Sequence, residues 1–560
     1  MNATAVDVPN LDGSRQRGRP LGAIGWMAVV VALALLVPIV AVLGNMFAPG
    51  EGTWTHLAQT VLPDYVSTTA VLLLGVTAGV LAIGVACAWL VTTCRFPGAR
   101  WFEWALILPL AMPAYVVAYA YTDVLQFAGP VQTWLRAIMG WRARDYWFPD
   151  IRSTGGAIVV FSLVLYPYVY LLARAAFLEQ SASLVEAGRL MGRGAWGTFM
   201  RVALPLARPA IAAGTSLALM ETLADFGAVS YFGVQTFTTG IYRAWLSMGD
   251  SVAAAQLSAM LLGFVAVILI AEQWNRGRAR FYNVTMHGQA HPPALHGARS
   301  AAAVAVCAVP PLLGFFVPAG ILLYVVLTEP EPLFTTRFVG LAGNTFTLAA
   351  TTSVAAIAIA TLLAYAARLS ASRIVFAANR FASLGYAIPG AVIAVGVLLP
   401  LGRLDNLIAD SVHAQFGFNL GLVLTGSIAA LVYAYLVRFL AIALQTVEAG
   451  LGKIRPSMED AARILGLTPT QTLFRVHAPM MRGSVFTAAL IVFVDVMKEL
   501  PATFALRPFN FDTLAVQAYN MAKDERLAEA AAASLVIVAV ALIPLMLLSR
   551  AIASGRAAAD

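Results

Sequence analysis

The chain has 560 residues, of which 60% are hydrophobic and only 11% are charged, with a formal net charge of +8. About a quarter of the residues in a soluble domain are charged, so this composition excludes an ordinary soluble globular protein. The positive charge does not indicate a nucleic-acid partner, because the basic residues are spread over short polar segments between apolar runs.

Apolar runs of about 20 residues recur along the chain, the length that a helix needs to cross a hydrocarbon core of about 30 Å. Lipid offers no hydrogen-bond partner to a bare backbone amide, so we expect an all-α membrane protein. The runs predict twelve transmembrane helices, at 24–43, 67–93, 101–126, 154–178, 206–230, 252–272, 301–327, 341–367, 378–402, 417–444, 483–505 and 529–549.

The first predicted span follows a polar segment that contains Arg15, Arg17 and Arg19, but its apolar run is too long for a signal peptide. It therefore indicates a retained anchor. With a cytoplasmic N-terminus, about 25 of the 36 Lys and Arg residues lie on the cytoplasmic side, as the positive-inside rule expects. An even number of spans then places the C-terminus in the cytoplasm too. Only the arginine-rich loop near residues 136–152 opposes this orientation.

A polar interruption, EAGRLMGRGAWGTFMRVALPLARP, follows the fourth predicted span. Ser183 and Glu186 have capping-box spacing, so a short helix is expected to begin there. Gly192 would end it in the left-handed conformation, and Pro205 would stop a second short helix before the next span. The pattern predicts a helix-turn-helix on the cytoplasmic face.

A second segment, DAARILGLTPTQTLFRVHAPMMRG, repeats this interruption 274 residues later, with Asp460 at the position of Glu186. Ser457 and Asp460 have nearly the capping-box spacing, Thr468 and Gln471 flank Pro469 as a second box, and Pro479 would stop the second helix. The alignment also pairs Ala187 with Ala461, Arg189 with Arg463, Gly192 with Gly466, Glu221 with Asp495 and Asp225 with Glu499.

This internal duplication predicts two parallel six-helix repeats, at 1–272 and 301–560, related by a pseudo-twofold axis along the membrane normal. Residues 273–300 would form a cytoplasmic linker. Its three histidines lack a metal-ligand spacing, so a solvated linker is favoured. The repeated segments, 183–205 and 457–479, could anchor to lipid headgroups, but duplication favours docking of a partner that is itself a symmetric dimer.

The two segments resemble the EAA loops of the membrane subunits of ABC importers, as Glu186-Ala187-Gly188 to Gly192 and Asp460-Ala461-Ala462 to Gly466. Gly188 and Asp460 depart mildly from the family's pattern. The resemblance implies an inner-membrane permease whose coupling helices insert into a homodimeric ATP-binding subunit, fed by a periplasmic binding protein. It assigns coupling roles to Glu186, Ala187, Arg189, Gly192, Asp460, Ala461, Arg463 and Gly466.

The chain has no nucleotide-binding motif of its own, because Gly450 to Ile454 lacks the glycine spacing and hydroxyl residue of a phosphate-binding loop. HExxH and nucleophile-elbow patterns are missing from the sequence, so an enzyme is not expected. We therefore expect no cofactor on this chain, and ATP and magnesium to be used by the partner ATPase.

Charged residues within predicted spans are candidates for a translocation path, because such charges are costly in lipid. The fifth span carries Glu221 and Asp225, and the eleventh carries Asp495, Lys498 and Glu499. Asp495 and Lys498 are three residues apart on one helical face, so an intrahelical ion pair is an equally weighted alternative.

Tyrosines within spans are weaker candidates as ligands, because phenol oxygen suits a hard cation such as Fe(III) but tyrosine is also a common interfacial anchor. Those considered are Tyr166, Tyr168 and Tyr170 on the fourth span, Tyr433 and Tyr435 on the tenth, and Tyr115, Tyr119 and Tyr121 on the third. Tyr166, Tyr168, Tyr433 and Tyr435 are retained as weak candidates for metal ligands.

The stretches from Asp225 to Asp250 and from Asp495 to Ala522 are similar to those of fused two-domain permeases that import ferric iron. The resemblance implies iron(III) as cargo. Thiamine, phosphonate-type compounds, sulfate and polyamines remain alternatives, because relatives that carry them look alike. A secondary transporter driven by an ion gradient is a more distant alternative, since it does not explain the duplicated cytoplasmic loops.

Overall fold

The computed structural model describes residues 22–49, 53–142, 145–179, 195–276, 294–329, 335–370, 372–418 and 421–557. These parts of the chain form helices joined by turns and contain no β-strand. Eleven of the described helices are long and apolar enough to cross a membrane, and a helix pair bent by 90° raises the number to twelve. The all-α membrane fold is therefore confirmed.

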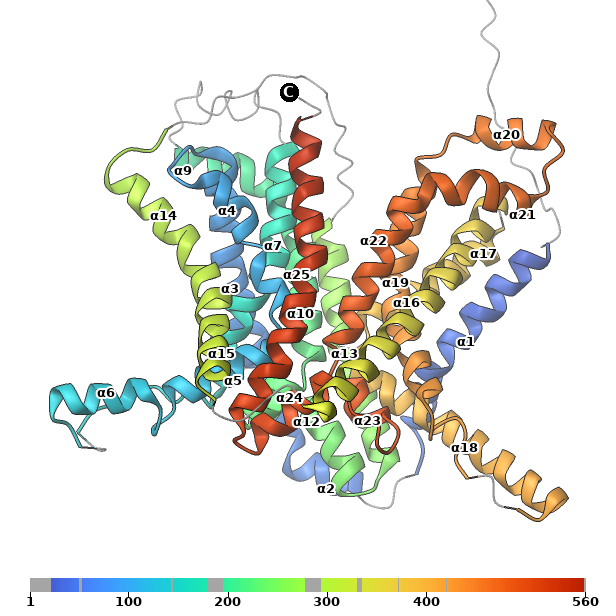
Figure 1. Cartoon of the computed structure of the whole chain (residues 1–560), viewed down its shortest axis with the longest axis horizontal. Helices are drawn as coiled ribbons and strands as arrows, with labels where there is room; N and C mark the ends of the chain where they lie inside the picture. Colours follow the sequence, from blue (N-terminus) through green and yellow to red (C-terminus); the bar gives the residue numbers. More distant parts are fainter. Residues whose placement is uncertain are drawn as a thin grey trace, which may run out of the picture.

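The first half contributes six spans and several short helices (Figure 1). Its spans are α1 (Ala23–Asn45), α3 (Leu62–Thr93), the bent pair α4 (Ala99–Ala105) and α5 (Ala114–Leu125), α7 (Thr154–Glu179), α10 (Leu204–Ala224) and α13 (Ser251–Arg276). Its short helices are α2 (Thr53–Thr60), α6 (Pro130–Met139), α9 (Ala195–Thr198), α11 (Gly227–Tyr231) and α12 (Phe237–Tyr242).

The second half repeats this order of elements. Its spans are α14 (Ala298–Pro311) continued by α15 (Val317–Thr328), α16 (Thr336–Leu369), α17 (Arg373–Ala382) followed by α18 (Gly390–Phe416), α19 (Ile428–Gly452), α22 (Ala478–Met497) and α25 (Leu527–Ala557). Its short helices are α20 (Pro456–Ile464), α21 (Pro469–Thr472), α23 (Pro501–Leu506) and α24 (Leu514–Lys523). The helices α9 and α21, which the duplication relates, lie on the same edge of the molecule, so the repeats are parallel (Figure 1).

The first span of each half packs mainly on the other half. Helix α1 lies against α16, α17 and α18, and α14 lies against α3 and α4 of the first half. The hydroxyl of Tyr433 donates to the carbonyl of Ala34 in α1 at 2.5 Å, and that of Tyr121 donates to Leu313 at 2.5 Å. This exchange of helices interlocks the two repeats.

Glycines permit the close approach of these helices. A Cβ atom at Gly396 would collide with the backbone of Pro38 in α1, and one at Gly314 would collide with the backbone of Leu163 in α7. Gly75 and Gly79 have the same effect in α3, because a Cβ atom there would collide with the side chains of Ile158 and Ser162 in α7.

Four of the predicted spans are shorter than expected or are broken in the structure, although the apolar pattern of the sequence continues through these points. The expected helix at 101–126 bends by 90° before Pro113, and the one at 378–402 breaks before Pro389. The residue before each proline, Met112 and Ile388, has an extended backbone, because the proline ring disfavours the helical conformation at that position. The expected helices at 206–230 and 483–505 stop at Ala224 and Met497. The span predicted at 417–444 instead covers 428–452.

Pro205 and Pro479 do not stop a helix, contrary to the prediction. Each follows a π-helical turn, Phe199–Ala203 and Leu473–His477, that leads without a break into α10 and α22. The Leu204 amide reaches back to Phe199, and the Ala478 amide reaches back to Leu473. This wider turn accommodates a proline, which lacks an amide hydrogen and clashes with the preceding turn of a regular helix.

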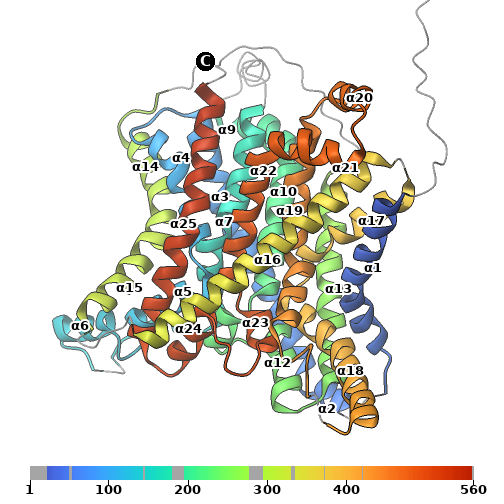
Figure 2. The ribbon, with the colours of Figure 1, turned by 45° about the vertical axis from the view of Figure 1, so that its right-hand side comes forward.

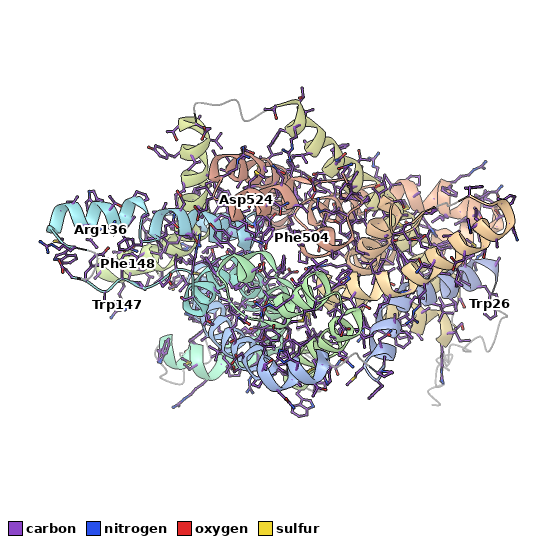
Figure 3. The ribbon with its side chains drawn as sticks, turned by 90° about the horizontal axis from the view of Figure 1, so that it is seen from below. Trp26, Arg136, Trp147, Phe148, Phe504 and Asp524 are labelled. Atoms are coloured by element: carbon purple, nitrogen blue, oxygen red, sulfur yellow. The ribbon has the colours of Figure 1, made fainter. Side chains whose placement is uncertain are left out.

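Two amphipathic arms project from the edge opposite α20 and α21 (Figure 1). One is α6, and the other is the end of α18. Viewed from below, Arg136, Trp147 and Phe148 lie far out on the first arm, Trp26 lies at the opposite end of the molecule, and Phe504 and Asp524 lie near the centre (Figure 3). Phe504 belongs to α23 and Asp524 follows α24, so the short helices after α22 lie near the centre beneath the bundle.

Candidate functional site

The centre of the molecule contains a cavity of about 110 Å³ between the two halves. Helices α7 and α10 line it from the first half, and α19 and the break after α22 line it from the second. All five residues predicted for the path line this cavity: Glu221, Asp225, Asp495, Lys498 and Glu499. The structure therefore brings together charged residues that lie 274 positions apart in the sequence.

Asp225 and Glu499, which the duplication pairs, both cap the short helix that follows a break. The carboxylate of Asp225 accepts the amide hydrogens of Ala228 and Val229 at 2.9 and 3.2 Å. That of Glu499 accepts those of Ala502 and Thr503 at 2.8 and 3.0 Å. Amides at a helix start have no partner within the helix, so these carboxylates hold α11 and α23 in place.

Two ion pairs neutralise the carboxylates of the second half. Lys498 lies 2.8 Å from Asp495, so the intrahelical pair considered as an alternative forms. Arg438 of α19 lies 3.1 Å from Glu499, and both side chains are buried. A buried carboxylate and guanidinium stabilise each other against the cost of leaving water.

The first half lacks these two cations. The gapless offset of 274 residues places Ala224 at the position of Lys498 and Val164 at that of Arg438. Instead, the carboxylate of Glu221 accepts a hydrogen bond of 3.0 Å from the hydroxyl of Tyr386, on the opposite half. The cavity is thus lined by four carboxylates but only two cationic side chains, and the excess of negative charge lies on the first-half side.

The sequence prediction missed Arg438 and Tyr386, which also line the cavity, and did not retain Tyr115, which lines it too. Arg438 interrupts an apolar span, so its charge alone was a signal for a functional position. Tyr115 is buried, and its hydroxyl has no hydrogen-bond partner among the described residues. Nothing in the local sequence distinguishes Tyr115 or Tyr386 from interfacial tyrosines.

Of the four tyrosines retained as candidate ligands, only Tyr168 lines the cavity. The hydroxyl of Tyr433 is engaged by α1, and that of Tyr435 is bonded to Thr503. Tyr166 is fully buried elsewhere, beside α3 and α14. Within the described parts of the chain, no group of three or more His, Cys, Asp and Glu side chains is arranged to hold a metal ion.

The second repeated segment forms the predicted pair of helices, α20 and α21. Gly466 ends α20 with a φ of +79°, and Thr468 and Gln471 form a capping box around Pro469, as expected. The predicted cap at Ser457 is wrong, because α20 begins at Pro456 and Arg455 occupies the capping position without a side-chain bond. Proline is well suited to the first helical position, so it sets the start here.

The outer face of this element is exposed and apolar. Ile464, Leu465 and Phe474 are 85%, 79% and 68% exposed. Asp460 lies 3.8 Å from Arg463, and both point into solvent. Large exposed apolar side chains rimmed by charges are typical of a protein interface. The corresponding residues of the first segment, Glu186, Ala187, Arg189 and Gly192, lie outside the described residues.

A family model described as "Binding-protein-dependent transport system inner membrane component" matches the chain twice, at residues 80–278 and 356–556. The chain belongs to this family. Two matches in one chain confirm the duplication, and each match covers the break and capping residues of its own half. The family is that of multi-pass inner-membrane permeases, in agreement with the apolar helices of the fold.

Three relatives show how the similarity is distributed. The chain is 26% identical to the Fe(3+)-transport system permease protein FbpB 2 of Haemophilus influenzae, over 95% of this chain and 99% of that one. It is 30% identical to the molybdenum transport system permease protein ModB of Escherichia coli, over 35% of this chain and 84% of the relative. It is 26% identical to the sulfate transport system permease protein CysT of Escherichia coli, over 37% of this chain and 73% of the relative.

Proposed function

We propose that this permease is the membrane-spanning subunit of an ATP-driven importer that moves iron(III), delivered by an external binding protein, across the inner membrane. The observation that carries the proposal is the similarity to an Fe(3+)-transport permease along nearly the whole length of both chains. The relatives named for molybdenum and sulfate correspond to a part of this chain only.

The charge of the central cavity supports a cationic cargo. Four carboxylates face two cations there, so the cavity attracts a cation and repels an oxyanion such as molybdate or sulfate. Carboxylate and phenol oxygens are also the ligand types that suit a hard cation.

The size of the cavity supports a small cargo. Its volume of about 110 Å³ corresponds to a few water molecules and is well below the roughly 300 Å³ of the smallest pockets for drug-sized ligands. Thiamine and polyamines are larger, so they would need a wider cavity than this conformation offers.

In the proposed cycle, a homodimeric ATPase binds the two coupling segments and hydrolyses ATP with magnesium. The apolar face of α20 and α21 is the surface offered to it. In this proposal α20, α21 and the end of α25, which lie on one edge of the molecule, face the cytoplasm (Figure 1). A gradient-driven transporter would leave these exposed faces unexplained.

The experiment is to reconstitute the chain with its ATPase and to measure ATP hydrolysis with the binding protein loaded with Fe(III), molybdate or thiamine in separate reactions. We expect stimulation by the iron-loaded protein. Stimulation by molybdate or thiamine alone would contradict the cargo, and hydrolysis indifferent to any binding protein would contradict the importer.

A further inference from the structure

Helices α20 and α21 lie together at one edge of the molecule (Figure 2). One arginine joins three helices of the second half there. Arg368, near the end of α16, donates from Nη1 to the carbonyl of Leu451 and from Nη2 to that of Ile454, both at 2.6 Å. Its Nε donates to the carboxylate of Glu459 in α20 at 2.5 Å. The planar guanidinium thus caps the end of α19 and holds α20 at the same time.

Three further contacts join the same helices. The hydroxyl of Tyr365, one turn before Arg368, donates to the carbonyl of Pro469 in α21 at 2.7 Å. The ring of Tyr365 packs edge-on against His477, which is fully buried at the start of α22. His477 Nε2 lies 3.3 Å from the carboxylate of Glu459, although the angle does not make a hydrogen bond. Glu459 is therefore the point where α16, α20 and α22 meet.

Glu459 is not the acid of the EAA pattern, which is its neighbour Asp460. The two differ sharply in environment, because the side chain of Glu459 is 13% exposed and that of Asp460 is 67% exposed. Asp460 is thus free to meet a partner, whereas Glu459 faces the protein's own helices.

The duplication does not reproduce this set of contacts in the sequence of the first half. The offset that aligns the two segments places Val185 at the position of Glu459 and Ala203 at that of His477. Neither side chain carries a charge, so the first segment has no ion pair like that of Glu459 at these two positions.

We infer that Glu459 is a positioning residue that attaches the second coupling segment to α16, α19 and α22, through an ion pair that the sequence of the first segment does not repeat at the equivalent position. The inference rests on the proposed function, since it assigns to α20 the transmission of movement from an ATPase. A charge-assisted hydrogen bond in a nearly buried setting keeps α20 in a fixed relation to the membrane helices. Movement of α20 then moves α16 and α19 with it.

The test compares Glu459→Gln with Glu448→Gln in the reconstituted complex. Glu448 is a matched control, because its carboxylate contacts Asn379 at 3.2 Å in the same half, between α17 and α19, and does not touch α20. The readout is the amount of cargo moved per ATP hydrolysed, together with the abundance and melting temperature of the complex. We expect Glu459→Gln to lower this ratio about tenfold while ATP hydrolysis continues, and Glu448→Gln to leave it unchanged.

Two more variants keep the result interpretable. Glu459→Asp retains the charge and should restore part of the ratio, which a merely structural defect would not predict. If Glu459→Gln does not accumulate, Arg368→Lys serves instead, because lysine keeps the charge but cannot donate to three acceptors in this geometry. If these variants move as much cargo per ATP hydrolysed as the wild type, the inference about Glu459 is wrong, while the proposed function is unaffected. A wild-type complex without ATP-driven uptake overturns the proposed function.

Discussion

Tyr386 of the second half donates its hydroxyl to the carboxylate of Glu221 of the first half, 3.0 Å away across the central cavity. The equivalent carboxylate, Asp495, is paired with Lys498 instead. Glu221 has no ion pair among the described residues, so a cation that enters the cavity finds its free charge on the first half. Glu221 and Asp495, which the duplication pairs, therefore have different hydrogen-bond and ion-pair partners.

The first prediction concerns this free carboxylate. Glu221→Gln should lower uptake of iron(III) about tenfold. Of the four carboxylates that line the cavity, Glu221 is the one that neither forms an ion pair nor caps a helix among the described residues. The chain should still insert and bind its ATPase. Uptake by vesicles containing the reconstituted complex is the measurement, with Glu448→Gln as the control. Unchanged uptake would show that cargo does not interact with Glu221.

The second prediction separates folding from transport at the equivalent caps. Glu499→Gln leaves Arg438 buried without its anion, and we expect a loss of about 3 kcal/mol or more of stability. Asp225→Asn retains a capping oxygen and strands no cation, so it should cost about 1 kcal/mol or less. Thermal unfolding in detergent measures both. Equal effects would contradict the structural importance of the ion pair.

The predictability of the site from sequence differs from residue to residue. The intrahelical pair of Asp495 and Lys498 follows from a spacing of three, because such neighbours share a helix face. The partner of Glu499 is 61 residues away in α19, and no local pattern links the two. Pairing across helices depends on how the helices pack, and a single sequence does not contain that information in local form.

The fold shows the same contrast. Most of the spans follow from their apolar length, because lipid imposes that length on the sequence. The duplication follows from the self-similarity of the two halves. The sequence does not predict the breaks after Ala224 and Met497, because the apolar pattern continues through both. There Asp225 and Glu499 cap new short helices, α11 and α23. The prediction that Pro205 and Pro479 end a helix is wrong, because a π-helical turn before each proline lets the helix continue.

The third prediction tests the interlocked first helices. Gly396→Val should destabilise the protein by about 1–3 kcal/mol, because the added atoms collide with the backbone of Pro38 in α1. Gly402→Ala is the matched control in the same helix, where a Cβ meets nothing within 4 Å. Melting temperatures of both variants decide the matter. A stable Gly396→Val variant would mean that α1 does not pack on α18 in this way.

The fourth prediction concerns the coupling segments. Gly466 adopts a left-handed φ of +79° with open space around it, so Gly466→Val strains the backbone by about 1–2 kcal/mol without a clash. We expect reduced stimulation of ATP hydrolysis with normal insertion of the chain. Reversing the charges of Glu186 and Asp460 together should have the same effect. Full ATP-dependent uptake in these variants would exclude a coupling role for the two segments.

The most direct measurement is the uptake of radiolabelled iron(III) into proteoliposomes that contain the permease and its ATPase, with the binding protein outside and ATP inside. We predict accumulation that requires both ATP and the iron-loaded binding protein and that excess molybdate does not reduce. Accumulation of molybdate in place of iron, or iron uptake that persists without ATP, would contradict an ATP-driven ferric iron permease.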